Sequence, residues 1–209
     1  MDQPQAVLIL GPSGSGKSPF GDYLEITGLW GRDCLHFDFG RWLRKAVRRR
    51  PLDVLAPEEV EFLEGVLHEG KLLEDRHFHI ARKILLHFIR GHRPELAAGR
   101  LLILNGLPRH IGQARDVDGL VDVRAVIELD CPPEVSRERI ATNAGGDREH
   151  RDDDQLDAVR RRHRDFELRT RPVIDHYRSQ GAEVLTVPVG VCTGPAELAT
   201  ATERVRDRL

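Results

Sequence analysis

The sequence lacks paired cysteines and long apolar segments. Its three cysteines are Cys34, Cys131 and Cys192, and no two of them stand in the C-x-x-C spacing that is typical of zinc sites. This usage fits a reducing compartment, and we interpret the three side chains as small buried groups. No uncharged apolar stretch is long enough to span a membrane, and the N-terminal "MDQPQ" does not resemble a signal peptide. We therefore expect a cytoplasmic protein.

The chain also lacks an excess of either charge. It has 34 acidic and 32 basic residues, which gives a net charge of −2. Without a positive field over the whole molecule, binding to nucleic acid or to an anionic membrane is not favoured. Only four of the basic residues are lysines, so an arginine is assigned a function here only where its position has a reason. The length suits one domain over residues 1–209 that carries small inserted lobes.

Short apolar runs alternate with amphipathic stretches along the chain. Continuous runs of Leu, Ile and Val are typical of parallel strands that are buried on both faces, so we predict an α/β fold. The expected strands are residues 6–10, 34–38, 101–105, 124–130 and 182–187. The expected helices are residues 16–27, 41–49, 57–68, 73–90, 112–121, 133–142, 153–179 and 195–208.

The first expected strand runs directly into "GPSGSGKS", residues 11–18. This segment matches G-x-x-x-x-G-K-[ST], in which glycines let backbone amides and a helix N-terminus surround a phosphate. Lys17 is predicted to reach the β and γ phosphates of ATP, and the Ser18 hydroxyl to bind Mg²⁺. The alternative is a glycine-rich turn without a ligand, but the position between a strand and a helix favours the phosphate site. The predicted ATP-binding residues are Gly11, Ser13, Gly14, Ser15, Gly16, Lys17 and Ser18.

Four later segments, together with this motif, resemble the adenylate kinases and related nucleoside monophosphate kinases over nearly the whole chain. They are "HFDFGRWLR" (36–44), "GKLLEDR" (70–76), "LILNGLPRHIGQA" (102–114) and "RDDDQLDAVRRRHRDFELRTRPVIDHY" (151–177). The resemblance implies a P-loop three-layer α/β/α sandwich around a five-stranded parallel sheet of order 2-3-1-4-5. It also implies a lobe at 39–75 that binds the nucleoside monophosphate (NMP) and a short lid at 143–154.

The resemblance also assigns roles to arginines. Arg44 and Arg109 would hold the phosphate of the acceptor nucleotide. Arg139, Arg151 and Arg162 would converge, with the motif lysine, on the phosphates that are transferred. Guanidinium groups suit this chemistry because they bind phosphate oxygens in a bidentate fork and stay charged. Catalysis of phosphoryl transfer is mostly alignment and neutralisation of charge, so a ring of such groups is what the reaction needs.

Other positions agree with the family pattern or depart from it. Gln113 stands where adenylate kinases hydrogen-bond the adenine edge of AMP, whereas Phe39 replaces a small or hydroxyl-bearing residue of the acceptor lobe. Asn105 replaces an aspartate and is expected to hold Mg²⁺ through a water molecule, without adding negative charge. Asn143 replaces an arginine that binds phosphate, and Arg148 is the nearby candidate to substitute for it. The short lid lacks the Cys or His set that binds zinc in long-lid relatives, so no structural metal is expected.

The sequence leaves three functions open. The principal expectation is an ATP- and Mg²⁺-dependent nucleoside monophosphate kinase that converts ATP and AMP into ADP. A second is a kinase for another acceptor, such as CMP, UMP, a deoxynucleotide or a small metabolite. A third is a nucleotide-binding regulatory protein in which transfer is weakened by the asparagine substitutions. The resemblance also implies a monomer.

Overall fold

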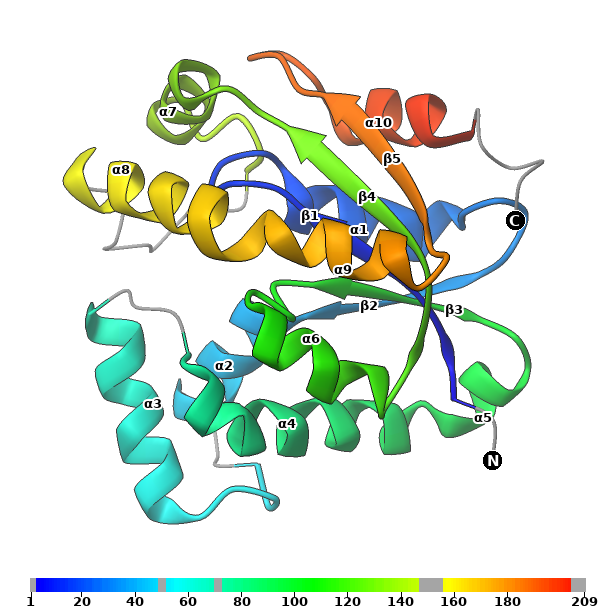
Figure 1. Cartoon of the computed structure of the whole chain (residues 1–209), viewed down its shortest axis with the longest axis vertical. Coiled ribbons are helices and arrows are strands. Elements are labelled where there is room, and N and C mark those ends of the chain that lie inside the picture. Colours follow the sequence, from blue (N-terminus) through cyan, green and yellow to red (C-terminus); the bar gives the residue numbers. More distant parts are fainter. Residues whose placement is uncertain (1–2, 49–51, 70–72, 147–155, 204–209) are drawn as a thin grey trace.

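Five parallel strands form the centre of the computed structural model, which describes residues 3–48, 52–69, 73–146 and 156–203. Their order is β2-β3-β1-β4-β5 (Figure 1), which confirms the predicted fold class and strand order. The strands are β1 (Gln5–Leu10), β2 (Cys34–Asp38), β3 (Leu101–Asn105), β4 (Asp122–Asp130) and β5 (Glu183–Pro188). In such sheets the ligand binds beyond the carboxyl ends of the strands, so this edge is where a site is expected.

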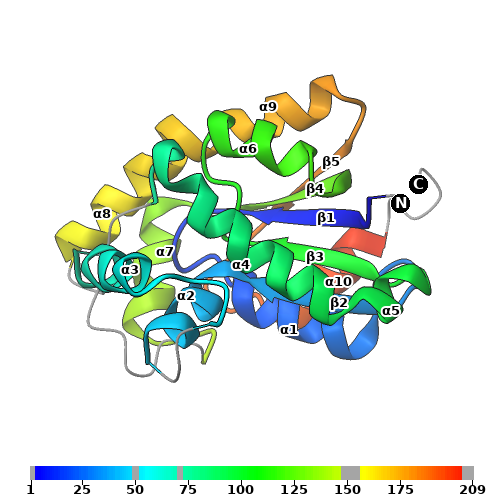
Figure 2. The ribbon, with the colours of Figure 1, turned by 90° about the horizontal axis from the view of Figure 1, so that it is seen from below.

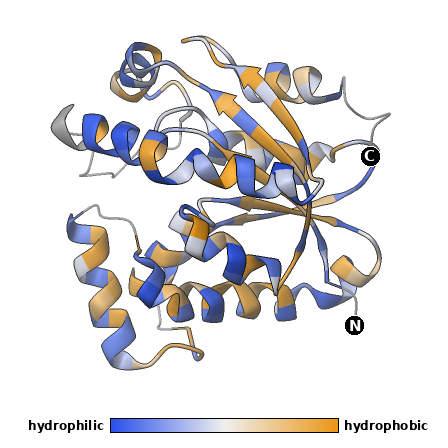
Figure 3. Ribbon diagram, viewed as in Figure 1, coloured by the Kyte–Doolittle hydropathy of each residue, from blue (hydrophilic) through white to orange (hydrophobic). Residues whose placement is uncertain are grey.

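Both faces of the sheet are buried, which explains the uninterrupted apolar runs. Successive side chains of β1 point to opposite faces, so that Leu8 joins one core with Leu104 while Val7 joins the other with Ile103. These four side chains have no exposed surface. Figure 3 shows the hydrophobic colour running along the strands, with hydrophilic residues gathered on the outer sides of the helices.

Helices cover the sheet in two layers (Figures 1 and 2). One layer consists of α1 (Lys17–Thr27) and α10 (Pro195–Thr202), which contribute Leu24 and Leu198 to the core around Val7. The other layer consists of α4 (Phe78–Gly91), α6 (Ile111–Asp118) and α9 (Pro172–Ser179). Its side chains fill the core around Leu8. No helix within the described ranges is both long enough and apolar enough to cross a bilayer.

The expected acceptor lobe contains α2 (Phe39–Arg48) and α3 (Pro57–Glu69), and α3 stands away from the sheet in Figure 1. The start of α3 agrees with the sequence prediction, because Pro57 occupies the first helical turn, where its missing amide is not needed. The Glu59 carboxylate accepts a hydrogen bond from the Ala56 amide at 2.9 Å and caps this turn. Residues 49–51 and 70–72 of the expected lobe lie outside the described residues.

The helix predicted over 153–179 is interrupted in the structure. It consists of α8 (Leu156–Asp165), a π-helical segment η2 (Phe166–Thr170) and α9. Pro172 explains the interruption, because its ring has no amide hydrogen and clashes with the carbonyl four residues earlier. The Arg171 amide instead donates to the Phe166 carbonyl, five residues earlier, at 2.8 Å. The short helix α5 (Arg93–Ala97) was not predicted, and the 3₁₀ turn η1 (Asp75–His77) lies within the helix predicted over 73–90. Helix α7 (Pro133–Ala141) agrees closely with its predicted range.

The cysteines follow the prediction at two of their three positions. Cys34 and Cys131 are buried and Cys192 is exposed, and all are free thiols. The interpretation of Cys192 as a buried side chain was therefore wrong. It lies in the short connection between β5 and α10, where the chain runs over the surface.

Candidate functional site

The glycine-rich segment forms a tight loop between β1 and α1. Gly14 and Gly16 have φ angles of 85° and 93°, in the left-handed region that glycine adopts without a steric penalty. A Cβ atom at Gly14 would lie 2.8 Å from the Ser136 carbonyl oxygen, so a larger residue would push α7 away from the loop. The predicted strand-loop-helix context of the motif is confirmed, and it places the N-terminus of α1 behind the loop.

The Lys17 side chain folds back across this loop. Its Nζ atom donates hydrogen bonds to the Gly11 and Pro12 carbonyl oxygens, each at 2.7 Å, and approaches Ser15 Oγ at 3.4 Å. The loop thus presents an ammonium group and backbone amides within one small hollow. This arrangement fits the β and γ phosphates of ATP, since both kinds of group are donors to anionic oxygens.

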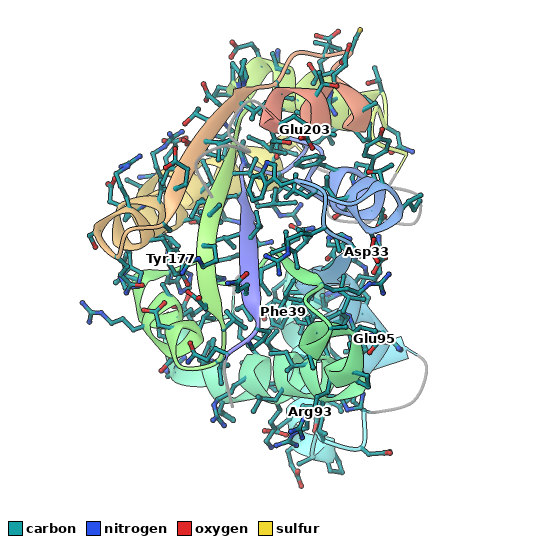
Figure 4. All side chains as sticks on the ribbon, turned by 90° about the vertical axis from the view of Figure 1, so that its right-hand side faces the viewer. Asp33, Phe39, Arg93, Glu95, Tyr177 and Glu203 are labelled. Carbon is teal, nitrogen blue, oxygen red and sulfur yellow. The ribbon has the colours of Figure 1, made fainter. Side chains whose placement is uncertain are left out.

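The loop borders a cavity that is also lined by the end of β2 with α2, by α3 and Leu73, by the end of β3 with the segment that leads into α6, and by α8 and η2. Phe39, at the start of α2, is one of its lining residues, and Figure 4 places it in the interior of the molecule. The sequence-predicted residues that line this cavity are Gly11, Ser13, Gly14, Lys17, Ser18, Phe39, Arg44, Asn105, Arg109, Gln113 and Arg162. Ser15, which is part of the loop, is buried.

Ser18 is part of a compact polar group at the carboxyl ends of β2 and β3. Its hydroxyl donates to Asp38 Oδ2 at 2.5 Å, and Asn105 Nδ2 lies 3.2 Å from Ser18 Oγ and 3.1 Å from Asp38 Oδ2. Asp38 and Asn105 are direct partners in the parallel register of the two strands. Both are buried and both line the cavity.

Asp38 was not among the sequence-predicted site residues. Burial would raise the pKa of its carboxyl group, but hydrogen bonds from the Ser18 hydroxyl and the Arg41 amide outweigh burial and hold the pKa below its ordinary value. The carboxylate is therefore charged at neutral pH. A signal was present in the sequence, because Asp38 is a charged residue at the carboxyl end of an otherwise apolar run.

Gln113 connects the site to the end of the acceptor lobe. Its Oε1 atom accepts from the Arg109 amide at 2.9 Å, and its Nε2 atom donates to the Leu73 carbonyl at 2.6 Å. The Arg109 guanidinium is steadied by a bond from Nε to the Gly106 carbonyl at 3.0 Å. Each half of the Gln113 amide can make one more hydrogen bond. Contact with an adenine edge therefore stays a prediction that this geometry permits.

Arg139 has partners that differ from the predicted phosphates. It is buried on α7, and its Nε atom donates to the Gly14 carbonyl at 3.0 Å. Its Nη1 atom donates to the carbonyls of Gly190, Val191 and Thr193 at 2.8 to 2.9 Å. The side chain therefore joins the phosphate-binding loop to the connection between β5 and α10. Its predicted contact with phosphate stays a prediction.

The remaining predicted positions lie toward the expected lid. Arg162 on α8 is one of the residues that line the cavity, and its predicted contact with the transferred phosphates stays a prediction. Asn143 follows α7 with a φ angle of 49°, a left-handed conformation in which asparagine is enriched relative to most residues. This backbone geometry gives a physical reason for asparagine there. Arg148 and Arg151, and residues 147–154 of the expected lid, lie outside the described residues.

The candidate groups for Mg²⁺ at this site are the oxygen and amide groups of Ser18, Asp38 and Asn105. Among the described residues, no cluster of three or more His, Cys, Asp or Glu side chains could hold a metal ion. A hydroxyl, a carboxylate and a site for triphosphate oxygens match the oxygen ligands that Mg²⁺ prefers. The residues present therefore fit Mg²⁺ bound together with ATP.

The chain resembles curated proteins over most of its length. No model of a protein family matches it. The chain is similar to the adenylate kinases of Xylella fastidiosa (strain M23) and Xanthomonas axonopodis pv. citri (strain 306), with 32% identity over 181 residues in each case. It is also similar to the adenylate kinase of Stenotrophomonas maltophilia (strain R551-3), with 30% identity over 182 residues. Each of these matches covers 84% of this chain and 86% of the relative.

Proposed function

The chain belongs to the adenylate kinase family, and from this premise we propose that it transfers the γ-phosphoryl group of ATP to AMP, giving two molecules of ADP. The observation that carries the proposal is the convergence of the predicted phosphate-binding groups. Lys17, Arg109 and Arg162 come from three distant segments of the chain, yet they line one cavity. Convergence of cationic groups is what bringing two polyphosphate chains together requires.

The residues divide the work according to their position. The loop amides and Lys17 bind the β and γ phosphates of ATP, while Arg44 and Arg109 bind the phosphate of AMP. Arg162 faces the same cavity from α8 and neutralises charge on the group in transfer. The attacking oxygen of AMP is already anionic, so no protein general base is needed. Mg²⁺, when bound with ATP, supplies further neutralisation of the phosphate oxygens, and Ser18 is the residue that would hold it.

Exclusion of water is assigned to the acceptor lobe at 39–75 and the lid at 143–154. Two contacts support an organised boundary between the lobe and the rest of the molecule. Arg169 on η2 pairs with Glu74 at 2.6 Å, and His110 Nδ1 lies 2.9 Å from Asp75 Oδ1. Closure of both elements over the cavity would keep water from the γ-phosphoryl group and prevent ATP hydrolysis.

Another acceptor is the second candidate, because Phe39 brings an aromatic ring to the wall of the cavity. Leu43 and Leu73 are also part of this wall, so an apolar surface is available to the base. Gln113 favours AMP, since its amide can offer the donor and acceptor pair that an adenine edge matches. The two candidates differ in the base that is accepted and not in the transfer chemistry.

The test is an assay of the purified protein with ATP, Mg²⁺ and a panel of nucleoside monophosphates and deoxynucleotides. The expected result is that AMP is phosphorylated with the highest kcat/KM. Preference for a different monophosphate would support the second candidate. ATP binding without phosphorylation of any panel member would contradict the proposed kinase activity and favour a regulatory nucleotide-binding protein. The Arg109→Ala variant is the internal control, and it should weaken use of AMP far more than binding of ATP.

Cysteine usage and the family resemblance bear on the location and assembly of the protein. Three free thiols, without any pairing among them, support a reducing compartment, and we propose the cytoplasm. We also propose a monomer, which is implied by the family resemblance. Light scattering coupled to gel filtration should give the mass of a single 23.7 kDa chain, and a dimer mass would contradict this.

A further inference from the structure

A buried carboxylate stands beside the one hydroxyl that the sequence motif assigns to Mg²⁺. The motif places Ser18 on the metal, and Asn105 contributes no negative charge to this region. Protein sites for Mg²⁺ normally provide one or two carboxylates in addition to the phosphates of the substrate. The structure provides this carboxylate at Asp38, whose Oδ2 atom accepts the Ser18 hydroxyl at 2.5 Å.

We propose that Asp38 supplies, from the end of β2, the negative charge that steadies Mg²⁺ on ATP, acting through Ser18 and the water shell of the metal. Asp38 and Asn105 occupy partner positions of β2 and β3. One carboxylate is therefore present at this point of the sheet edge. It is Asp38 on β2, whereas the family pattern has an aspartate on β3 at the position of Asn105. The proposal rests on the proposed use of ATP with Mg²⁺ and not on which acceptor is phosphorylated.

The hydrogen bonds fix Asp38 in the orientation that this role requires. Its Oδ1 atom accepts the Arg41 amide at 2.9 Å, at the start of α2, which leaves Oδ2 directed at Ser18. A hydroxyl that donates its proton to a carboxylate keeps its two oxygen lone pairs as acceptors. One of those on Ser18 accepts from Asn105 Nδ2 at 3.2 Å, which leaves the other for a cation. This is the outer-shell arrangement that raises the basicity of a metal ligand and fixes its orientation.

Arg41, whose amide binds Asp38, directs its guanidinium group to a different carboxylate. The Arg41 guanidinium donates to both carboxylate oxygens of Asp22, at 2.8 and 2.7 Å. This bidentate pair gives the Arg41 charge a carboxylate of its own. Asp38 lines the cavity with Ser18, so its charge faces the space in which a metal ion on ATP would lie.

Asparagine at position 105 fits this arrangement because an uncharged donor suits a position beside the Asp38 carboxylate. Its Nδ2 atom donates toward Asp38 Oδ2 at 3.1 Å. A carboxylate in its place would bring two negative groups to hydrogen-bond distance without a proton between them, which is unfavourable in a buried site. The amide instead satisfies Asp38 and leaves a single net charge. A carboxylate at 38 and an amide at 105 are thus a matched pair.

The test measures how strongly Mg²⁺ tightens ATP binding, by calorimetric titration with Mg²⁺ and with EDTA. The proteins are the wild type, Asp38→Asn, Asn105→Asp, the double variant Asp38→Asn/Asn105→Asp, and Asp116→Asn as a control at an exposed carboxylate on α6. In Asp38→Asn the Mg²⁺-dependent tightening should fall by about 10- to 100-fold, the range for outer-shell groups of metal sites. Binding of ATP in EDTA should stay within about threefold of the wild type, because the loop and Lys17 are unchanged.

The double variant makes the test independent of simple damage to the site. It returns one carboxylate to this edge of the sheet, on the other strand, and should regain most of the Mg²⁺ effect. The proposal is overturned if Asp38→Asn keeps the wild-type Mg²⁺ effect or if the double variant fails to regain it while remaining folded by circular dichroism. These outcomes are separate from the acceptor assay, in which failure of the wild type would contradict the kinase activity whatever the Mg²⁺ titration gives.

Discussion

Opposite charges at single residues organise the two sides of the phosphate site. Lys17 lies across the glycine-rich loop, and Asp38 lies beyond Ser18 at the end of β2. Lysine provides a compact charge that can follow the phosphates, whereas Asp38 is held rigidly by three hydrogen bonds from Ser18, Arg41 and Asn105. The first group was evident from the motif, whereas the pairing of Asp38 with Asn105 became evident only from the register of the sheet.

Asn105→Asp should destabilise the protein in the absence of metal. The substitution replaces a donor by a carboxylate at a buried position 3.1 Å from Asp38 Oδ2. We expect the free energy of unfolding to fall by about 2 kcal/mol, the scale of a lost hydrogen bond that leaves a buried group unsatisfied. Urea denaturation in EDTA measures this, and addition of ATP with Mg²⁺ should reduce the deficit. Unchanged stability would mean that the two side chains do not meet as described.

Helix α7 supports the loop at the scale of elements. The Ser136 hydroxyl donates to the Ser13 carbonyl, and Arg139 joins Gly14 to the connection after β5. A glycine-rich loop has high conformational freedom when unfolded, so its native shape depends on such external contacts. Contacts from α7 therefore preorganise the loop before a nucleotide binds.

Arg139→Ala should weaken both folding and ATP binding. It leaves four main-chain carbonyls without their donor at a buried position, and we expect a loss of about 3 kcal/mol in the free energy of unfolding. Urea denaturation and titration with ATP in EDTA measure the two effects. Arg137→Ala, at an exposed position of α7, is the matched control and should change stability by less than about 0.5 kcal/mol. A loss of phosphoryl transfer with wild-type stability would instead support the predicted contact of Arg139 with phosphate.

At the scale of the whole molecule, the fold buries two of the three thiols and leaves the third exposed. Burial raises the pKa of the Cys34 thiol to about 12 and that of Cys131 to about 11. Cys192 is exposed. Since the thiolate is the reactive form, the two buried thiols should be inert at neutral pH.

Titration with a chromogenic disulfide should therefore detect one fast thiol in the native protein and three in urea. Cys192→Ser should abolish the fast reaction and leave the slow ones. Fast reaction of more than one thiol in the native wild type would show that the core around α1 or the segment after β4 opens readily.

The strands, the phosphate-binding loop and most helices were predictable because their signals are local. An apolar run, three glycines and a lysine within eight positions, or a proline in a first helical turn depend on neighbours in the chain. The interruption at η2 was missed because Pro172, a local signal that ends or kinks a helix, was left inside the helix predicted over 153–179. The exposure of Cys192 was missed because the number and spacing of the cysteines do not indicate which of them lie on the surface.

The sequence by itself determined that a glycine-rich loop with a lysine follows the first strand, and it predicted that this loop binds a triphosphate with the help of arginines. Tertiary structure decided which side chains meet: Asp38 and Asn105 are 67 positions apart and become neighbours through the pairing of β2 with β3. Arg139 is likewise directed to main-chain carbonyls by the packing of α7 against the loop. The physical reason is that hydrogen bonds between strands and helices depend on register and packing, which short-range sequence patterns do not specify.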